Sequence, residues 1–185
     1  IASGSRAAAP PIPGLDTVPY LTNETLFELR QAPEHLIIIG GGPIGMEMAQ
    51  AHRRLGSKVT VIEAQKALGK DDPELAAIVI DGLRSEAVTI LEDSKVAGVE
   101  NTATGVSISV ETDEGDRNSV EGSHLLLATG RAPTVDGLDL EKAGVAYSRK
   151  GIEVDRGLRT SNRRIYAIGD VTGGLQFTHV AGSHA

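Results

Sequence analysis

The sequence predicts an α/β fold built on a parallel β-sheet, and three observations predict it. An apolar run at residues 36–39 leads into a glycine-rich turn, and apolar side chains then recur at helical spacing. A second apolar strand follows at residues 58–62. Strand, helix and strand in this order form the unit that sets two parallel strands side by side beneath a crossing helix.

The turn between the first strand and the helix has the spacing GxGxxG, from Gly40 to Gly45. Gly40 permits a tight turn, Gly42 lets the backbone approach a pyrophosphate, and Gly45 lets the helix lie close to the sheet. The unpaired N–H groups at the helix start favour phosphate, and Pro43 at the first helical position loses no hydrogen bond. We therefore predict a dinucleotide site at this turn and the start of the helix.

Glu63 ends the second strand, 23 positions after Gly40 (63 − 40). An acid in this register accepts hydrogen bonds from both ribose hydroxyls of NAD and repels a 2′-phosphate. Lys66 and Lys70 follow it and could hold that phosphate, so NAD is predicted and NADP stays open. On the helix itself, Met46 and Met48 also suit packing, and residues 52–54 suit a solvated face.

Further elements are expected along the whole chain. We expect helices at 22–31 and 73–85, a third parallel strand at 88–91, and a returning apolar strand at 125–127. Residues 106–111 alternate with period two and precede a polar turn at 112–117, which predicts an antiparallel meander. Short strands are expected at 152–154 and 165–168, with a polar turn at 159–164 between them. Together these elements predict a Rossmann-like fold of three layers, with a parallel sheet and an antiparallel meander.

The composition excludes several classes of partner. The net charge is −7 and the 185 residues include no Trp, two Phe and three Tyr, which argues against a nucleic-acid partner. No apolar run approaches the roughly 20 residues that span a bilayer. Cysteine is absent, which excludes thiolate metal sites and suits a cytoplasmic location. His179 and His184 lack other ligands at metal-binding spacing, so we expect no metal site.

Four motifs in order give the chain a resemblance to the pyridine nucleotide-disulfide oxidoreductase family. Residues 1–5 are similar to the family's Ala-Thr-Gly segment, and the stretch from Gly40 to Glu63 is similar to its NAD fingerprint. Residues 128–134 resemble the second Ala-Thr-Gly segment, and residues 160–170 resemble the second flavin fingerprint. Parents similar to dihydrolipoamide dehydrogenase and to mercuric reductase both remain open.

The resemblance implies further cofactor contacts. The residues that would line the NAD site are Gly40, Gly41, Gly42, Pro43, Ile44, Gly45, Met46 and Glu47. Glu47 would lie near the nicotinamide, Val96 near the adenine, and Gly130 near the dinucleotide. Asp170 would accept a hydrogen bond from the ribityl chain of FAD. The other residues implied at the flavin are Ser3, Gly4, Ser5, Gln176, Phe177, Thr178 and His179.

The resemblance also implies that the chain is the middle of a longer protein. We expect an NAD(P)-binding domain at residues 21–128. It is flanked by a partial FAD-domain segment and a Pro-rich connector at 1–20, and by a partial FAD-domain segment at 129–185. The parent would pass hydride from NAD(P)H to FAD and on to a disulfide or similar acceptor, and would form a homodimer through a C-terminal domain. The chain alone, which carries no catalytic residue of its own, would not turn over. The alternative is an NAD(H)-binding sensor without catalysis, which would have no use for the flavin-facing segments.

Overall fold

The computed structural model describes residues 1–112 and 115–185. Its contacts divide the chain into two compact units. One consists of residues 9–130, and the other combines residues 1–8 with 131–185. Each unit has hydrophobic core residues of its own.

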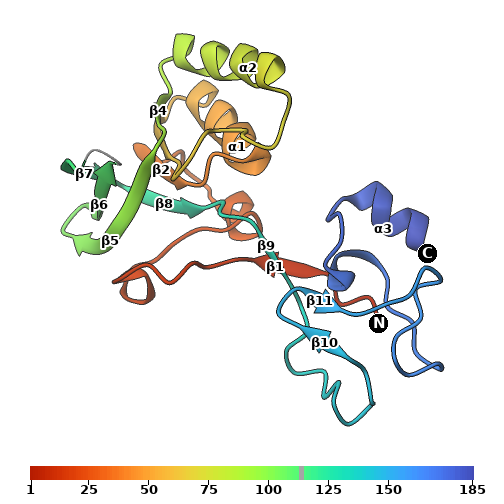
Figure 1. The fold of residues 1–185 in the computed structure, drawn as a ribbon. Coiled ribbons are helices and arrows are strands. Elements are labelled where there is room, and N and C mark those ends of the chain that lie inside the picture. The colour runs from red at the N-terminus through yellow and green to blue at the C-terminus, as the bar shows by residue number, and fades with distance from the viewer. Residues whose placement is uncertain (113–114) are drawn as a thin grey trace. The chain divides into compact units, whose positions relative to one another are not determined.

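A four-stranded parallel sheet forms the centre of residues 9–130 (Figure 1). Its order is β4-β3-β2-β8, and all three pairings are parallel. The strands are β2 (His35–Ile39), β3 (Lys58–Ile62), β4 (Thr89–Leu91) and β8 (His124–Leu127). This confirms the parallel sheet, the third strand and the returning strand that the sequence predicts.

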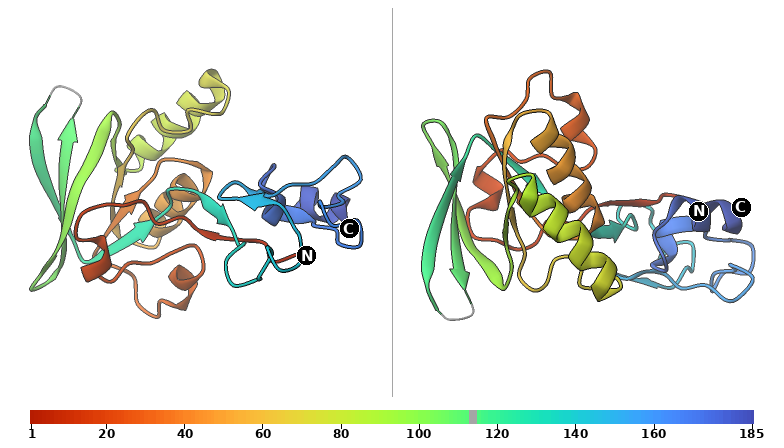
Figure 2. Two further views of the ribbon diagram at one scale, coloured as in Figure 1. Left: turned by 60° about the horizontal axis from the view of Figure 1, so that its bottom comes forward. Right: turned by 90° about the horizontal axis from the view of Figure 1, so that it is seen from above.

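Helices cover one face of this sheet and an antiparallel sheet covers the other (Figure 2). The helices are α1 (Pro43–Arg54) and α2 (Pro73–Ser85). The antiparallel sheet has the order β5-β6-β7, with β5 (Ser94–Thr102), β6 (Gly105–Thr112) and β7 (Arg117–Gly122). The three layers and the meander are as predicted, although residues 113 and 114 of the predicted turn lie outside the described residues.

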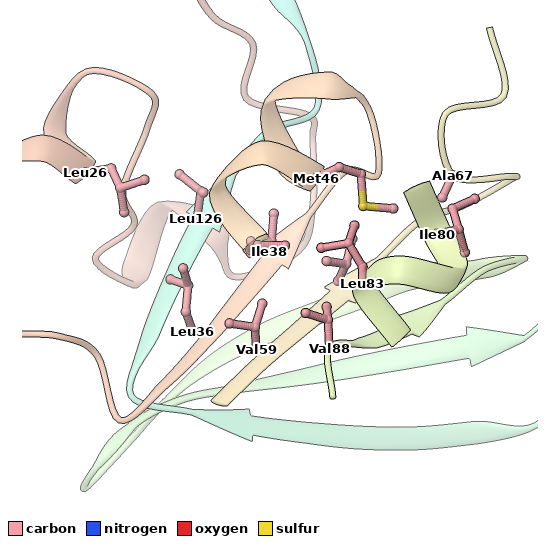
Figure 3. Close-up of a cluster of buried hydrophobic side chains, with 12 residues drawn as sticks. Leu26, Leu36, Ile38, Met46, Val59, Ala67, Ile80, Leu83, Val88 and Leu126 are labelled. Carbon is pink, nitrogen blue, oxygen red and sulfur yellow. The ribbon is translucent and has the colours of Figure 1, made fainter. Parts of the chain in front are cut away.

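Alternation along β2 decides which core each side chain enters. Leu36 and Ile38 face the helices, and Ile37 and Ile39 face the meander. All four are nearly or wholly buried, as expected for a strand covered on both faces. On the helix side, Met46 of α1 and Leu83 of α2 point toward one another above the sheet (Figure 3).

The predicted helix at 22–31 is wrong in extent. Only a 3-10 turn, η2 (Thr25–Glu28), forms there, and it buries Leu26 alone while Phe27 is 74% exposed. A short helix needs an apolar face to pack, and one buried side chain does not supply it. Upstream, a second 3-10 turn, η1 (Leu15–Thr17), buries Leu15 in the core beneath the meander.

The second unit has little regular structure. It pairs β1 (Ser5–Ala7) with β9 (Arg131–Pro133) and β10 (Tyr147–Ser148) with β11 (Gly151–Ile152), both antiparallel. A 3-10 turn, η3 (Gly169–Thr172), and α3 (Thr178–His184) complete it. The predicted strand at 165–168 is wrong, because only Tyr166 makes a ladder contact, an isolated bridge to Arg159.

Candidate functional site

Gly40 forms the turn at the end of β2. Its φ of 109° lies in the region that favours glycine, and a Cβ there would come 2.4 Å from the carbonyl oxygen of Ala128. Ala128 in turn donates its N–H to the carbonyl of Ile39. The second Ala-Thr-Gly segment therefore runs alongside the glycine-rich turn.

Gly45 lies where α1 crosses the end of β2. A Cβ at this position would come 2.0 Å from the carbonyl oxygen of Gly40. Ala49, one turn further along the helix, is fully buried. Only small side chains allow this close contact between helix and sheet.

Gly42 differs from both, because the fold does not require glycine there. Its φ of −77° suits any residue, and a Cβ would meet no atom of the described residues within 4 Å. Gly42 also precedes α1, which no described side chain caps. The unpaired N–H groups of the first turn therefore face a space that a side chain at position 42 would fill.

Glu63 is held against this turn by two backbone donors. Its Oε2 accepts from the N–H of Gly41 at 2.7 Å, and its Oε1 accepts from the N–H of Gln65 at 2.9 Å. Each carboxylate oxygen has a second lone pair. The carboxylate is therefore oriented beside the helix start and keeps acceptor capacity for a ligand.

The loop after Glu63 is tied to the same turn. Leu68 donates its N–H to the carbonyl of Gly41, and Lys66 forms an ion pair with Asp93. The hydrogen bond to Asp93 raises the pKa of Lys66 above its ordinary value. Lys66 is thus engaged by a carboxylate, whereas the other candidate cation, Lys70, is exposed.

The remaining residues predicted at the dinucleotide differ in accessibility. Glu47 is exposed and lines a groove of about 420 Å³ between α1 and α2, together with Pro43. Gly130 is also exposed, with a φ of 117°. Met46 is 3% exposed and packs in the core, as its spacing on the helix also allowed. Val96 of β5 is half-buried against the core beneath the meander.

In the other unit, Ser5 and Asp170 are brought together across 165 residues of sequence. The Oγ of Ser5 donates to the Oδ2 of Asp170 at 2.6 Å. Gly4 accepts from the N–H of Thr134, and Ser3 donates its hydroxyl to the carbonyl of Thr134. The first segment is thereby fixed to the second one along β1 and β9.

Arg131 joins this contact and was missed as a site residue in the sequence. Its Nε donates to the Oγ of Ser5 at 2.6 Å, its Nη2 donates to the carbonyl of Ser5 at 2.7 Å, and its Nε lies 3.8 Å from the Oδ2 of Asp170. The signal available in the sequence was a cation directly after the second Ala-Thr-Gly segment. The acid that lies beside it in space is distant in the sequence.

A cavity of about 500 Å³ opens beside this contact. Gly4, Arg131 and Asp170 line it, together with Gln176 and Thr178 from the segment predicted at the flavin. The other two residues of that segment, Phe177 and His179, stack on one another with ring centroids 5.4 Å apart. All eight predicted flavin contacts and Arg131 therefore belong to one unit.

Neither a metal cluster nor a membrane-spanning helix occurs in the part of the chain that the structure describes. No three His, Cys, Asp or Glu side chains there are grouped so that they could hold a metal ion. No helix there is long and apolar enough to cross a membrane.

Parallel sheet, glycine-rich turn and antiparallel meander define a Rossmann-like α/β protein. The family model described as pyridine nucleotide-disulphide oxidoreductase matches residues 1–185. The chain belongs to the pyridine nucleotide-disulphide oxidoreductase family.

Individual relatives agree with this assignment. Mercuric reductase of Streptomyces lividans is 43% identical over 185 residues, which is all of this chain and 39% of that protein. The probable pyridine nucleotide-disulfide oxidoreductase RclA of Escherichia coli is 38% identical over 184 residues, 98% of this chain and 41% of that protein. The chain thus spans about two fifths of the length of these two relatives.

Solved structures match over the same region. The Cu(II) complex of the HOCl-induced flavoprotein disulfide reductase RclA from Escherichia coli superposes with a TM-score of 0.90 at 36% identity, covering 100% of this chain and 42% of that one. LpdA from Mycobacterium tuberculosis superposes with a TM-score of 0.85 at 32% identity, covering 99% of this chain and 39% of that one. The RclA structure is that of a flavoprotein disulfide reductase, and this chain shares the fold of the matched part of both solved chains.

Proposed function

We propose that this chain is the NAD(P)H-binding portion, with flanking flavin-binding segments, of an FAD-dependent pyridine nucleotide-disulfide oxidoreductase. The dinucleotide domain comprises residues 21–128 and lies inside the compact unit 9–130. Residues 1–20 and 129–185 include the flavin-facing segments. In the parent, the nicotinamide supplies a hydride and FAD passes the electrons to a disulfide or similar acceptor.

The observation that carries the proposal is the open space at Gly42. Gly40 and Gly45 are explained by contacts within the chain, whereas a Cβ at Gly42 would meet no described atom within 4 Å. A ligand that passes over the start of α1 explains this glycine. A pyrophosphate fits there, because the first turn offers N–H donors and the positive end of the helix dipole.

Glu63 gives the site a preference between the two dinucleotides. Its carboxylate is oriented by Gly41 and Gln65, so it can accept from the ribose hydroxyls of NADH without first being ordered. The same charge opposes the 2′-phosphate of NADPH. Lys66 is already paired with Asp93, which favours NADH further.

The rest of the parent is proposed from the family alone. Relatives with this arrangement include mercuric reductases and a disulfide reductase, so we leave the acceptor open. Because the chain spans about two fifths of these relatives, we expect no turnover from the chain by itself. A cytoplasmic homodimer is the state that we propose for the parent. The sensor alternative is disfavoured, because it leaves the contact between Ser5 and Asp170 without a use.

Titration of the chain with NADH and with NADPH, followed by nicotinamide fluorescence, tests the proposal. The absence of Trp keeps the protein background low. We expect NADH to bind more tightly and ADP-ribose to displace it. Tighter NADPH binding would overturn the role of Glu63, and binding of neither would overturn the dinucleotide site of this chain.

A further inference from the structure

Three polar side chains form a directed chain of hydrogen bonds in the unit of residues 1–8 and 131–185. Arg131 donates to Ser5, and Ser5 donates to Asp170, each at 2.6 Å between side-chain atoms. The side chains of Arg131 and Asp170 are only 22% and 20% exposed. The contact is therefore partly shielded from water, where charge-assisted hydrogen bonds are stronger than at an open surface.

The direction of these hydrogen bonds follows from the donors available. A guanidinium has donors only, so the Oγ of Ser5 must accept from Arg131. A hydroxyl carries a single proton, which the Ser5 Oγ then gives to the Oδ2 of Asp170. A second hydrogen bond, from the Arg131 Nη2 to the carbonyl of Ser5, makes the contact between the guanidinium and Ser5 bidentate.

We propose that Arg131 and Ser5 are positioning residues that hold the Asp170 carboxylate for a polyhydroxyl ligand. Their contacts engage Oδ2, so Oδ1 is assigned to the hydroxyl of the occupant. The proposal rests on the flavin-binding role given above and adds that Asp170 is preorganised by residues from both segments, β1 and β9. The ligand is the ribityl chain of a flavin dinucleotide.

The adjoining cavity fits this ligand chemistry. It has a volume of about 500 Å³ and is lined by Gly4 and Gly169 and by the polar side chains of Gln176 and Thr178. An ionised carboxylate accepts hydrogen bonds and donates none. A hydroxyl-bearing chain therefore suits Asp170, whereas a second anion does not.

A double-mutant cycle on the full 185-residue chain tests the inference. FAD binding is measured by the quenching of flavin fluorescence for the wild type, Ser5→Ala, Asp170→Ala and the double variant. We expect Ser5→Ala to weaken FAD binding about tenfold, and to have no further effect once Asp170 is alanine, because Ser5 acts through that carboxylate. Ser148→Ala, a serine of the same unit on β10, should bind FAD as the wild type does.

Arg131→Lys tests the bidentate contact of Arg131 with Ser5 separately. Lysine keeps the charge but cannot donate to both Ser5 atoms in one plane, so we expect a loss similar to that of Ser5→Ala. Arg159→Lys is the matched control, because the Nε of Arg159 donates to the Tyr166 hydroxyl in the same unit. Equal, small effects of both lysine variants would overturn the role of Arg131.

A second measurement needs no flavin. Proton exchange at the Arg131 Nε, followed by NMR, should be slow in the wild type and faster in Ser5→Ala and in Asp170→Ala. Wild-type-like exchange in both variants would overturn the directed chain of hydrogen bonds. Absence of FAD binding by the wild type would instead overturn the proposed flavin role, whereas binding with additive losses would overturn only the positioning role.

Discussion

At the scale of single residues, one motif contains glycines with different purposes. Gly40 and Gly45 are required by backbone contacts, and Gly42 is required only if a ligand lies over it. A sequence pattern treats the three alike. In the structure their roles differ. Measuring both the free energy of unfolding and the NADH affinity of substituted variants distinguishes these roles.

Gly42→Val should remove dinucleotide binding and leave the fold intact. The backbone at Gly42 suits valine, and the side chain would point into open space. We expect NADH affinity to fall at least tenfold, about 1.4 kcal/mol, with an unchanged melting temperature. Gly82→Ala is the matched control, because a Cβ there also meets no described atom within 4 Å but lies on α2. Wild-type affinity in Gly42→Val would mean that the dinucleotide lies elsewhere.

Gly45→Ala, in contrast to Gly42→Val, should lower the free energy of unfolding. Its methyl group would come 2.0 Å from the carbonyl oxygen of Gly40, so α1 must move away from the sheet. Overpacking of this kind typically costs about 1–3 kcal/mol, which chemical denaturation would detect. An unchanged free energy of unfolding would show that the helix does not need this close contact.

Glu63→Ala should affect the two dinucleotides unequally. NADH loses acceptors for its ribose hydroxyls, and a hydrogen bond to a charged group contributes about 1.5–3 kcal/mol. NADPH loses a repulsion instead, so its affinity should hold or improve. Titration of the variant with both ligands measures the ratio, and equal losses would contradict the assignment of Glu63 as the selector.

At the scale of elements, the sequence predicted the parts that follow from periodicity. The apolar runs of β2, β3 and β8 and the alternation of β6 identified the central sheet and the meander. Residues 22–31 and 165–168 were assigned too much structure, because a few apolar side chains there suggested a helix and a strand, whereas only a 3-10 turn and one isolated bridge form. The fold of this chain was thus predictable where many side chains repeat a period.

His52 shows the same limit within a correctly predicted helix. The sequence suggested a solvated face for residues 52–54, but His52 is 9% exposed, and its Nδ1 has no hydrogen-bond partner among the described atoms. His52 lies near His124 of β8, and its carbonyl accepts from the N–H of Ser57. Burial of His52 depends on neighbours that local sequence does not reveal.

Two histidines should make stability depend on pH. Burial lowers the pKa of His35 and of His52, and the nearby Lys58 and His124, respectively, lower it further. The unfolded chain therefore takes up protons first, near the ordinary histidine pKa of about 6.5. The contribution of the two neutral histidines to the free energy of unfolding is complete above this pH. It is lost as the pH falls through the lowered pKa values of the folded state.

Urea denaturation at a series of pH values between about 7 and 5 measures this loss. A hydrogen bond with the backbone of Glu121 and the negative charge of Glu34 raise the pKa of His35 but do not reverse the shift. His52→Leu should make the free energy of unfolding less dependent on pH, because leucine fills the site without a titratable group. An unchanged dependence in this variant would contradict the contribution of His52.

At the scale of the whole molecule, the order of the motifs predicted the family. The boundary between the two compact units, however, differs from the domain boundary that the motifs suggested. The sequence suggested a domain of residues 21–128, whereas residues 9–20 pack in the same compact unit. Leu15 and Val18 enter the core beneath the meander, and Val99 donates its N–H to the carbonyl of Pro13. A proline-rich composition indicates an extended segment, but it does not indicate which surface that segment covers.

The continuous segment 9–130 should therefore fold and bind NADH without the remainder of the chain. It contains both cores of the parallel sheet, Gly42 and Glu63, and its ends coincide with the division between the two units. We expect cooperative unfolding and an NADH affinity within about threefold of that of the full chain. A shorter segment, 21–130, lacks Leu15 and Val18 and should be less stable, because it leaves part of the second core uncovered. If segment 9–130 folds but does not bind NADH, residues outside it must contribute to the dinucleotide site; if segment 21–130 is equally stable, residues 9–20 are a connector, as their composition first suggested.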